Sequence, residues 1–301
     1  VGSNICNFIH ARHYVNFFLS GTLQIKKHFK PLLIFFGMAV ASNLYTVLDT
    51  AMLGFLATDI EIGYYSAANK IVKMIIGILT AISAVLLPRL SYHAEKEQFS
   101  AFSALIEKSI ILFWMLSIPM CAGLFLLAKP ILLLFSGGNF IEALVPMRII
   151  TPVVAIISTT SLLGSPLSAL RKEKVSLIAV IIGAVTNFIC NVIFIPKFGA
   201  KGAAIGTLVA EASVLFFSSL FLLHFIIKKN VLTNTVQIMF ATAVMSICVY
   251  FLKKIPQNLF LQLGLAFMGG VCSYALLLVL LKNTYFCDTL NKIITMIRSK
   301  K

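Results

Sequence analysis

Long apolar stretches separated by short polar connections dominate the chain. Eight of them reach about 20 residues, the length that an α-helix needs to cross the hydrocarbon core of a bilayer: 31–57, 66–88, 109–128, 146–169, 176–195, 203–227, 234–252 and 258–281. They lack the period-two alternation of membrane β-strands, which are only about 10 residues long. The pattern predicts an all-α fold, a polytopic membrane helical bundle of about eight transmembrane helices.

Two further segments, 91–108 and the tail from Lys282, are basic and amphipathic. We expect both to lie along the inner membrane surface. The composition agrees with a membrane protein, because 59% of the 301 residues are hydrophobic and 12% are charged. Soluble domains carry about 25% charged residues, so a soluble two-domain enzyme is excluded.

The net charge of +15 reflects topology rather than a nucleic-acid partner, because the basic residues fall between the apolar stretches. If the first helix runs outward, the inner segments hold 17 of the 25 basic residues. The positive-inside rule then places both termini in the cytoplasm. No interaction with nucleic acid is expected.

The sequence offers no catalytic constellation. The six cysteines form no C-x-x-C pair, and H-E-x-x-H, G-x-S-x-G and P-loop motifs are absent. We therefore predict no catalytic residue, no metal site and no cofactor, and a protein that is not an enzyme.

Polar side chains in hydrocarbon are costly, so their positions within the spans indicate function. The second span is the richest, with a polar and small-residue stripe at three- and four-residue spacing: Ser66, Asn69, Lys70, Lys73, Gly77 and Thr80. Lys70 and Lys73 are candidates for binding an anionic substrate. Lys70 alternatively extends its ammonium group to the outer interface.

Asp49 and Lys73 lie at comparable depths, roughly 12 Å from the outer ends of the first two predicted spans. The sequence therefore predicts that they can pair. The pair either only offsets two desolvation costs or takes part in substrate or proton handling.

Three polar residues mark the fifth and sixth spans, which a short loop makes antiparallel neighbours. Asn187 and Asn191 are one turn apart, and Glu211 lies in the next span. We expect hydrogen bonds between this carboxylate and the two amides, with a proton- or cation-linked role for Glu211 as the alternative. Arg148, at the outer start of the fourth span, is either an interfacial anchor or a phosphate contact.

Three blocks of the sequence resemble the polysaccharide flippases of the multidrug/oligosaccharidyl-lipid/polysaccharide exporter superfamily. The blocks are Leu44–Lys73, Lys129–Pro152 and Asn187–Glu211, and the last is the most specific. It combines the Asn pair, an Ile-Pro turn, Phe-Gly and Gly-Ala-Ala at fixed spacing. Within the superfamily, the blocks resemble the O-antigen (Wzx-type) branch.

The resemblance implies a division of the chain. Such flippases have two six-helix lobes followed by two extra helices, and eight spans match the second lobe plus the extra pair. Residues 1–30 are then a cytoplasmic inter-lobe segment, 31–229 the six-helix carboxyl-terminal lobe, 230–282 the two additional transmembrane helices and 283–301 a basic cytoplasmic tail. We expect the first lobe to be missing, which fits a start without Met.

The resemblance also implies a function, the flipping of undecaprenyl-pyrophosphate-linked O-antigen repeat units across the bacterial inner membrane by alternating access. Lys70, Lys73 and Arg148 would then attract the pyrophosphate, and Asp49 or Glu211 would compete for these cations or carry a coupling proton. The expected partners are the lipid-linked oligosaccharide, membrane lipids and, in the cell, the O-antigen polymerase and chain-length machinery.

Three alternatives stay open. The first is another exporter of the same superfamily, either a lipid II flippase or a multidrug antiporter, although an antiporter favours acidic rather than cationic groups in its cavity. The second is an inactive, truncated remnant. A membrane glycosyltransferase fits less well, because the outer loops are short and contain no His.

Overall fold

The computed structural model describes residue 9 and residues 25–83, 85–223, 229–255 and 258–299. Every regular element in these ranges is helical, as the apolar pattern predicts. The elements are α2 (Ile25–Leu56), α3 (Asp59–Ser83), α4 (Leu86–Glu95), α5 (Phe99–Leu126), α6 (Ala128–Ser136), the 3-10 helix η1 (Gly138–Ala143), α7 (Leu144–Ile150), α8 (Val153–Ala169), α9 (Glu173–Phe198), α10 (Ala200–Leu220), α12 (Lys229–Leu252), α13 (Leu259–Leu280) and α14 (Thr284–Ser299).

Each predicted span corresponds to a helix or a broken helix. By length and composition, the described residues contain six helices able to cross a membrane, or seven if a pair bent by 44° counts as one span. That pair is 138–150 with 153–169, broken before Pro152. The first predicted span, 31–57, corresponds to α2. Within α2, the segment that counts as an apolar helix is Val47–Leu56, which is too short to cross a membrane by itself.

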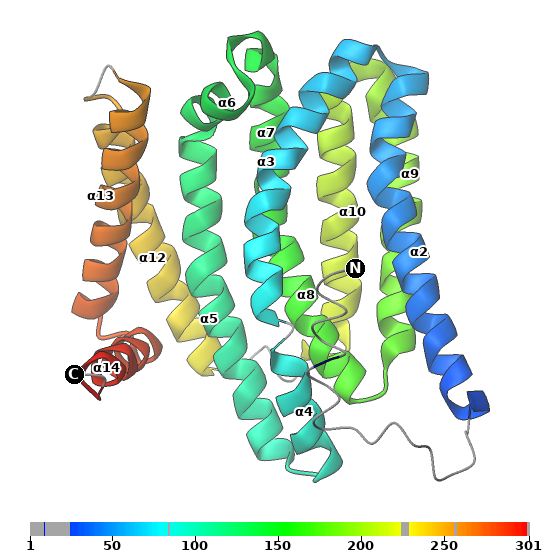
Figure 1. The fold of residues 1–301 in the computed structure, drawn as a ribbon, viewed down its shortest axis with the longest axis vertical. Coiled ribbons are helices and arrows are strands. Elements are labelled where there is room, and N and C mark those ends of the chain that lie inside the picture. Colours follow the sequence, from blue (N-terminus) through cyan, green and yellow to red (C-terminus); the bar gives the residue numbers. More distant parts are fainter. Residues whose placement is uncertain (1–8, 10–24, 84, 224–228, 256–257, 300–301) are drawn as a thin grey trace.

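The helices stand side by side with alternating direction (Figure 1). The α2–α3 turn, α6 and the α9–α10 turn lie at one end, whereas α4, the α8–α9 turn and α14 lie at the other. The segments expected on the inner side therefore share one end among the described elements. The assignment of this end to the cytoplasm stays a prediction.

The two amphipathic segments differ in outcome. The predicted segment 91–108 is divided between two helices: residues 91–95 end α4, and residues 99–108 begin α5, where Phe102 and Ile106 continue the buried face of that helix. The tail, in contrast, forms α14, which runs across the end of the bundle. Asn283 fixes this turn by donating Nδ2 to Asn234 Oδ1 at 2.9 Å and to Gln237 Oε1 at 2.8 Å.

Two apolar clusters hold the helices together. One joins α2, α3, α6, α7, α8, α9 and α10 and includes Val72 and Met147. The other attaches α12 and α13 to α5 and α8, through residues such as Ile110 and Ile238. Many other apolar side chains face outward, as a lipid-facing surface requires.

Candidate functional site

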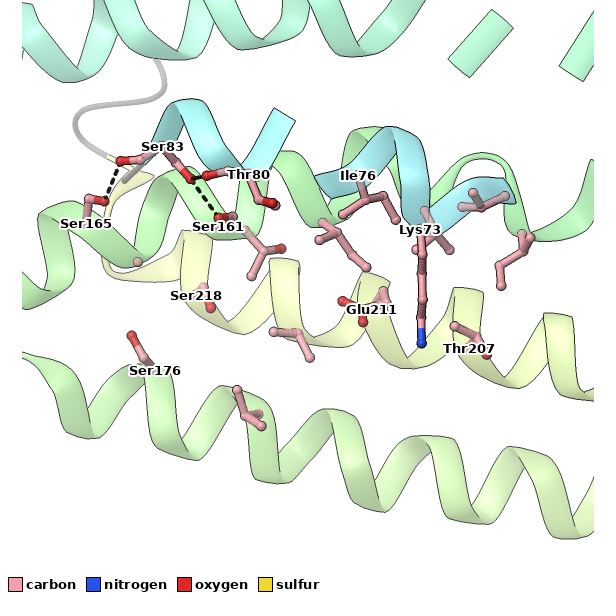
Figure 2. A pocket seen from close by; sticks show the side chains of 18 of the residues that line it. Lys73, Ile76, Thr80, Ser83, Ser161, Ser165, Ser176, Thr207, Glu211 and Ser218 are labelled. Atoms are coloured by element: carbon pink, nitrogen blue, oxygen red, sulfur yellow. Dashed lines mark hydrogen bonds between the residues drawn. The ribbon is translucent and has the colours of Figure 1, made fainter. Parts of the chain in front are cut away.

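An open cavity of about 680 Å³ lies among α3, α8, α9 and α10, with Asp49 of α2 at its wall. Its lining contains three charged residues, Asp49, Lys73 and Glu211. Figure 2 shows the cavity with the side chains of α3 facing those of α8 and α10. A cation, two carboxylates and many hydroxyl groups therefore meet inside an otherwise apolar bundle.

Asp49 is buried and accepts hydrogen bonds from three neighbouring helices. Asn187 and Asn191 of α9 donate their Nδ2 groups to Oδ1 of Asp49, at 2.8 and 2.7 Å. Tyr65 of α3 and Thr207 of α10 donate their hydroxyl groups to Oδ2, at 2.5 and 2.8 Å. We call these five residues the Asp49 cluster. It ties α2, α3, α9 and α10 together at one level of the bundle.

Glycines on α10 permit this close approach of α9. A Cβ atom at Gly206 would collide with the side chain of Asn191, and one at Gly202 would collide with the backbone of Phe194. The i, i+4 spacing of the two Asn residues places both amides on the same face of α9. The missing side chain at Gly206 therefore leaves room for Asn191 as both amides reach Asp49.

The predicted pair of Asp49 and Lys73 does not form. The structure begins α3 at Asp59, seven residues before the predicted start of that span. Lys73 is therefore about 21 Å along its helix, whereas Asp49 is only about 10 Å from the end of α2. Tyr65, two turns before Lys73, meets Asp49 instead.

Lys73 lines the cavity and makes no hydrogen bond or ion pair with another described residue. Its exposed side chain reaches across the cavity toward α10, and in Figure 2 its Nζ lies by the turn between Thr207 and Glu211. The attraction of the Asp49 carboxylate acts on it only through space. Its ammonium group therefore faces a space in which a ligand can bind.

Glu211 lies one turn after Thr207 on α10, is 4% exposed and lines the same cavity. The predicted hydrogen bonds from Asn187 and Asn191 to Glu211 are not formed, because both amides turn toward Asp49 of α2. The Asn pair does provide helix–helix polar contacts, but with a different helix. Glu211 shares the cavity with Lys73 instead.

The structure does not bring Lys70 and Arg148 to this cavity. Lys70 is exposed and lies outside the lining. Arg148 of α7 stacks its guanidinium on the ring of Phe125 of α5, with 5.5 Å from Cζ to the ring centroid. Among the three predicted pyrophosphate ligands, only Lys73 therefore lines the cavity.

At the other end of the cavity lies a row of hydroxyl groups, of which the sequence had singled out only Thr80. Ser83 of α3 and Ser161 of α8 are hydrogen-bonded at 2.9 Å, and Ser165 donates to the carbonyl oxygen of Ser83 at 3.4 Å (Figure 2). Thr80 and Ser218 line the same end. The signal was a run of Ser and Thr spaced three and four residues apart in the apolar sequence of α8.

The cavity offers carboxylate, amide and hydroxyl oxygens, which are ligands that suit a hard cation. Within the described part of the chain, no group of three or more His, Cys, Asp or Glu side chains gathers in a way that fits a metal ion. In the Asp49 cluster the amide nitrogens, as assigned from the hydrogen bonds, face the carboxylate. Oδ1 of Asn191 is buried without a partner there.

Comparison with known proteins identifies the architecture. The solved structure of lipid II flippase MurJ in an inward closed conformation superposes with a TM-score of 0.71 at 20% identity, covering 84% of this chain and 53% of that one. Because the identity is low, this likeness shows the fold alone. Two sequence relatives are a probable low-salt glycan biosynthesis flippase, Agl15, of Haloferax volcanii and a putative O-antigen transporter of Shigella dysenteriae.

These relatives match only part of their own length. The Haloferax protein is 26% identical over 174 residues, which are 58% of this chain and 37% of the relative. The Shigella protein is 24% identical over 189 residues, 61% of this chain and 46% of the relative. The chain thus spans less than half of these proteins. The sequence model of lipid II flippase MurJ matches residues 8–271, and the chain therefore belongs to this family of membrane flippases.

Proposed function

We propose that this chain takes part in moving a saccharide, linked through a diphosphate to a polyprenyl lipid, from one leaflet of the membrane to the other. The observation that carries the proposal is the side chain of Lys73, a cation without a hydrogen-bond or ion-pair partner among the described residues, in a cavity of about 680 Å³. An ammonium group is a suitable point charge for a phosphate oxygen. A drug cation would instead be repelled by it.

The two ends of the cavity would divide the recognition of such a substrate. Lys73 would hold the diphosphate, whereas the hydroxyl groups around Ser83 and Ser161 suit the hydroxyl groups of a sugar. The Asp49 cluster would keep the helices in register while the cavity opens alternately to the two sides. Lys70 and Arg148 would contribute only if the bundle rearranged during transport.

The resemblance noted in the sequence makes an O-antigen repeat unit on undecaprenyl pyrophosphate our first candidate. The second candidate is lipid II, which the family match favours. Both are saccharides on a polyprenyl diphosphate, so the same cavity chemistry serves either. In both cases we place the protein in the bacterial inner membrane with both termini in the cytoplasm, and for O-antigen the polymerase and chain-length machinery would receive the product.

Between the two acidic candidates, Glu211 is better placed than Asp49 to handle a coupling ion. Asp49 already accepts four hydrogen bonds, so binding an ion there would disrupt contacts among four helices. Glu211 lines the cavity near Lys73, where an arriving diphosphate changes the local charge. We propose that it competes with the substrate for the field of Lys73 or binds a coupling proton.

Complementation in two strains tests the proposal and separates the candidates. One strain lacks its O-antigen flippase and the other is depleted of its lipid II flippase. Because the chain spans less than half of its relatives, each strain receives both the chain and the longest reading frame that contains it. Restored surface O-antigen supports the first candidate, and restored growth supports the second. If neither surface O-antigen nor growth is restored although the protein reaches normal levels in the membrane, the proposed function is contradicted.

A further inference from the structure

A second hollow lies away from the Lys73 cavity, in the crevice where α5, α8 and α12 meet. Its volume is about 360 Å³, and its walls are apolar side chains such as Phe125 and Ala155, with Ser246 as the exception. None of its lining residues lines the Lys73 cavity. It begins at the end of α5 and reaches inward to Ile118, eight residues or about 12 Å before that end.

Two cations stand at the mouth of this crevice. The guanidinium of Arg148 lies over the ring of Phe125, and its Nε is buried with no hydrogen-bond partner. Lys253, directly after the end of α12, donates Nζ to the carbonyl oxygen of Leu126, another wall residue, at 3.2 Å. An ammonium group has three N–H donors and a guanidinium five, so most of these donors still lack an acceptor in the described structure.

An apolar crevice next to two cations suits a ligand that has both a hydrocarbon chain and a negative charge. A lipid with a phosphate headgroup offers oxygen acceptors to the cations and an acyl chain to the slot. The acyl chain gains van der Waals contacts with the apolar walls, and the phosphate supplies the acceptors that Arg148 lacks. A neutral lipid would provide only the first of these contacts.

We propose that the crevice among α5, α8 and α12 binds an anionic glycerophospholipid, with its phosphate between Arg148 and Lys253 and one acyl chain against Phe125. The occupant comes from the surrounding bilayer, because the α12–α13 pair stands at the edge of the bundle (Figure 1) and the crevice shares no wall residue with the Lys73 cavity. This site goes beyond the proposed transport function. It would fasten the α12–α13 pair to α5.

The chain contains a built-in probe, because it has a single Trp. Trp114 lies one turn before Ile118 on α5, and its Nε1 donates to Oγ1 of Thr159, one turn after Ala155 on α8, at 3.0 Å. It therefore sits just below the floor of the crevice. A brominated acyl chain in the crevice will quench its fluorescence by short-range contact.

The experiment places the full chain in nanodiscs that contain a rising fraction of brominated phosphatidylglycerol, or of phosphatidylcholine with the same brominated chains. We expect half-maximal quenching at an about tenfold lower fraction of phosphatidylglycerol. Replacing both cations, by Arg148→Gln with Lys253→Gln, should abolish this preference. The control Lys129→Gln removes an exposed charge near the same end of the bundle and should keep it.

Ala155→Leu provides a second, independent variant, because it fills the crevice and leaves both cations in place. It should reduce quenching by phosphatidylglycerol to the level of phosphatidylcholine. Equal quenching by the two lipids in the unmodified chain would overturn the proposal. So would an unchanged preference in Ala155→Leu, or displacement of the brominated phosphatidylglycerol by equimolar undecaprenyl diphosphate.

Discussion

The two levels of the main cavity use their charges in opposite ways. At the Asp49 level, four donors from three helices converge on one buried carboxylate. Two turns further along α3, the ammonium of Lys73 faces the cavity without a hydrogen-bond acceptor among the described residues. Both charges stand in an apolar bundle, where each is costly. The charge of Asp49 is stabilised by hydrogen bonds from the protein itself, and the charge of Lys73 is available to a ligand.

This contrast separates positioning from binding. A charge that is fully hydrogen-bonded holds helices in place, and its removal leaves buried donors unpaired. A charge that faces open space contributes little to stability, so its removal should affect ligand binding and not folding. Changes at the two levels should therefore have different effects on unfolding and on diphosphate binding.

The largest effect on stability is expected for Asp49→Ala. This change leaves the donors of Tyr65, Thr207 and both Asn residues without their common acceptor, and we expect the free energy of unfolding to fall by more than about 3 kcal/mol. Thermal denaturation of the purified protein in detergent measures it. Asp288→Ala, an exposed acidic position on α14, is the control and should shift the midpoint little.

Gly206→Ala should disrupt the Asp49 cluster through a steric clash. The new Cβ would collide with the side chain of Asn191, so the amide must move away from Asp49. We expect a loss of about 1–3 kcal/mol in the free energy of unfolding, from the same denaturation curves. Gly77→Ala in α3 adds a methyl group where no atom lies within 4 Å, and it should be neutral or slightly stabilising.

Tyr65→Phe removes one donor from the cluster and leaves the ring in place. The hydroxyl group lies 2.5 Å from Oδ2 of Asp49 and 2.9 Å from Oγ1 of Thr207, and Thr207 remains as a donor to that oxygen. The expected cost is therefore smaller, about 1–2 kcal/mol. A cost as large as that of Asp49→Ala would show that Tyr65, and not the carboxylate, organises this level.

The sequence predicted much of this arrangement, and one of its errors came from the position at which a helix begins. Apolar length located the six helices of the described residues that are long enough to span a membrane, and the bent pair beside them, and it marked the Asn pair and Asp49 as candidates. The pairing of Asp49 with Lys73 was wrong because a polar first turn, from Asp59 to Glu61, belongs to α3 although its composition resembles a loop. Because α3 begins about two turns earlier than predicted, Lys73 lies further from the start of its helix than Asp49 lies from the end of α2. Tyr65 lies at the depth of Asp49 instead.

Contacts between distant helices lay outside the reach of sequence patterns. Asn187 was expected to meet Glu211 on the adjacent helix, but the choice between α10 and α2 depends on which side of α9 each helix covers. Similarly, Arg148 was grouped with Lys73 by charge, depth and helical face, whereas packing places it over Phe125. Helical periodicity locates a residue on one helix, and tertiary packing decides which residue it meets.

The smallest change in stability and the largest change in binding are expected for Lys73. If Asp49 and Lys73 formed the ion pair that the sequence predicted, the double variant Asp49→Asn with Lys73→Gln would recover the function lost in the single variants, because neither buried charge would remain unpaired. Since Asp49 is instead hydrogen-bonded to its own cluster, we expect no such rescue. Surface polysaccharide in the complemented strain measures this, and recovery in the double variant would revive the ion pair.

The most direct test is equilibrium binding of undecaprenyl diphosphate to the protein in nanodiscs, measured together with the thermal midpoint. We predict that Lys73→Ala weakens binding about tenfold or more, that Lys73→Arg retains most of it, and that neither changes the free energy of unfolding by more than about 0.5 kcal/mol. Lys70→Ala, which removes an exposed charge outside the cavity on the same helix, should bind normally. Unchanged affinity in Lys73→Ala, or an equal loss in Lys70→Ala, would contradict the assignment of Lys73 as the diphosphate ligand of this cavity.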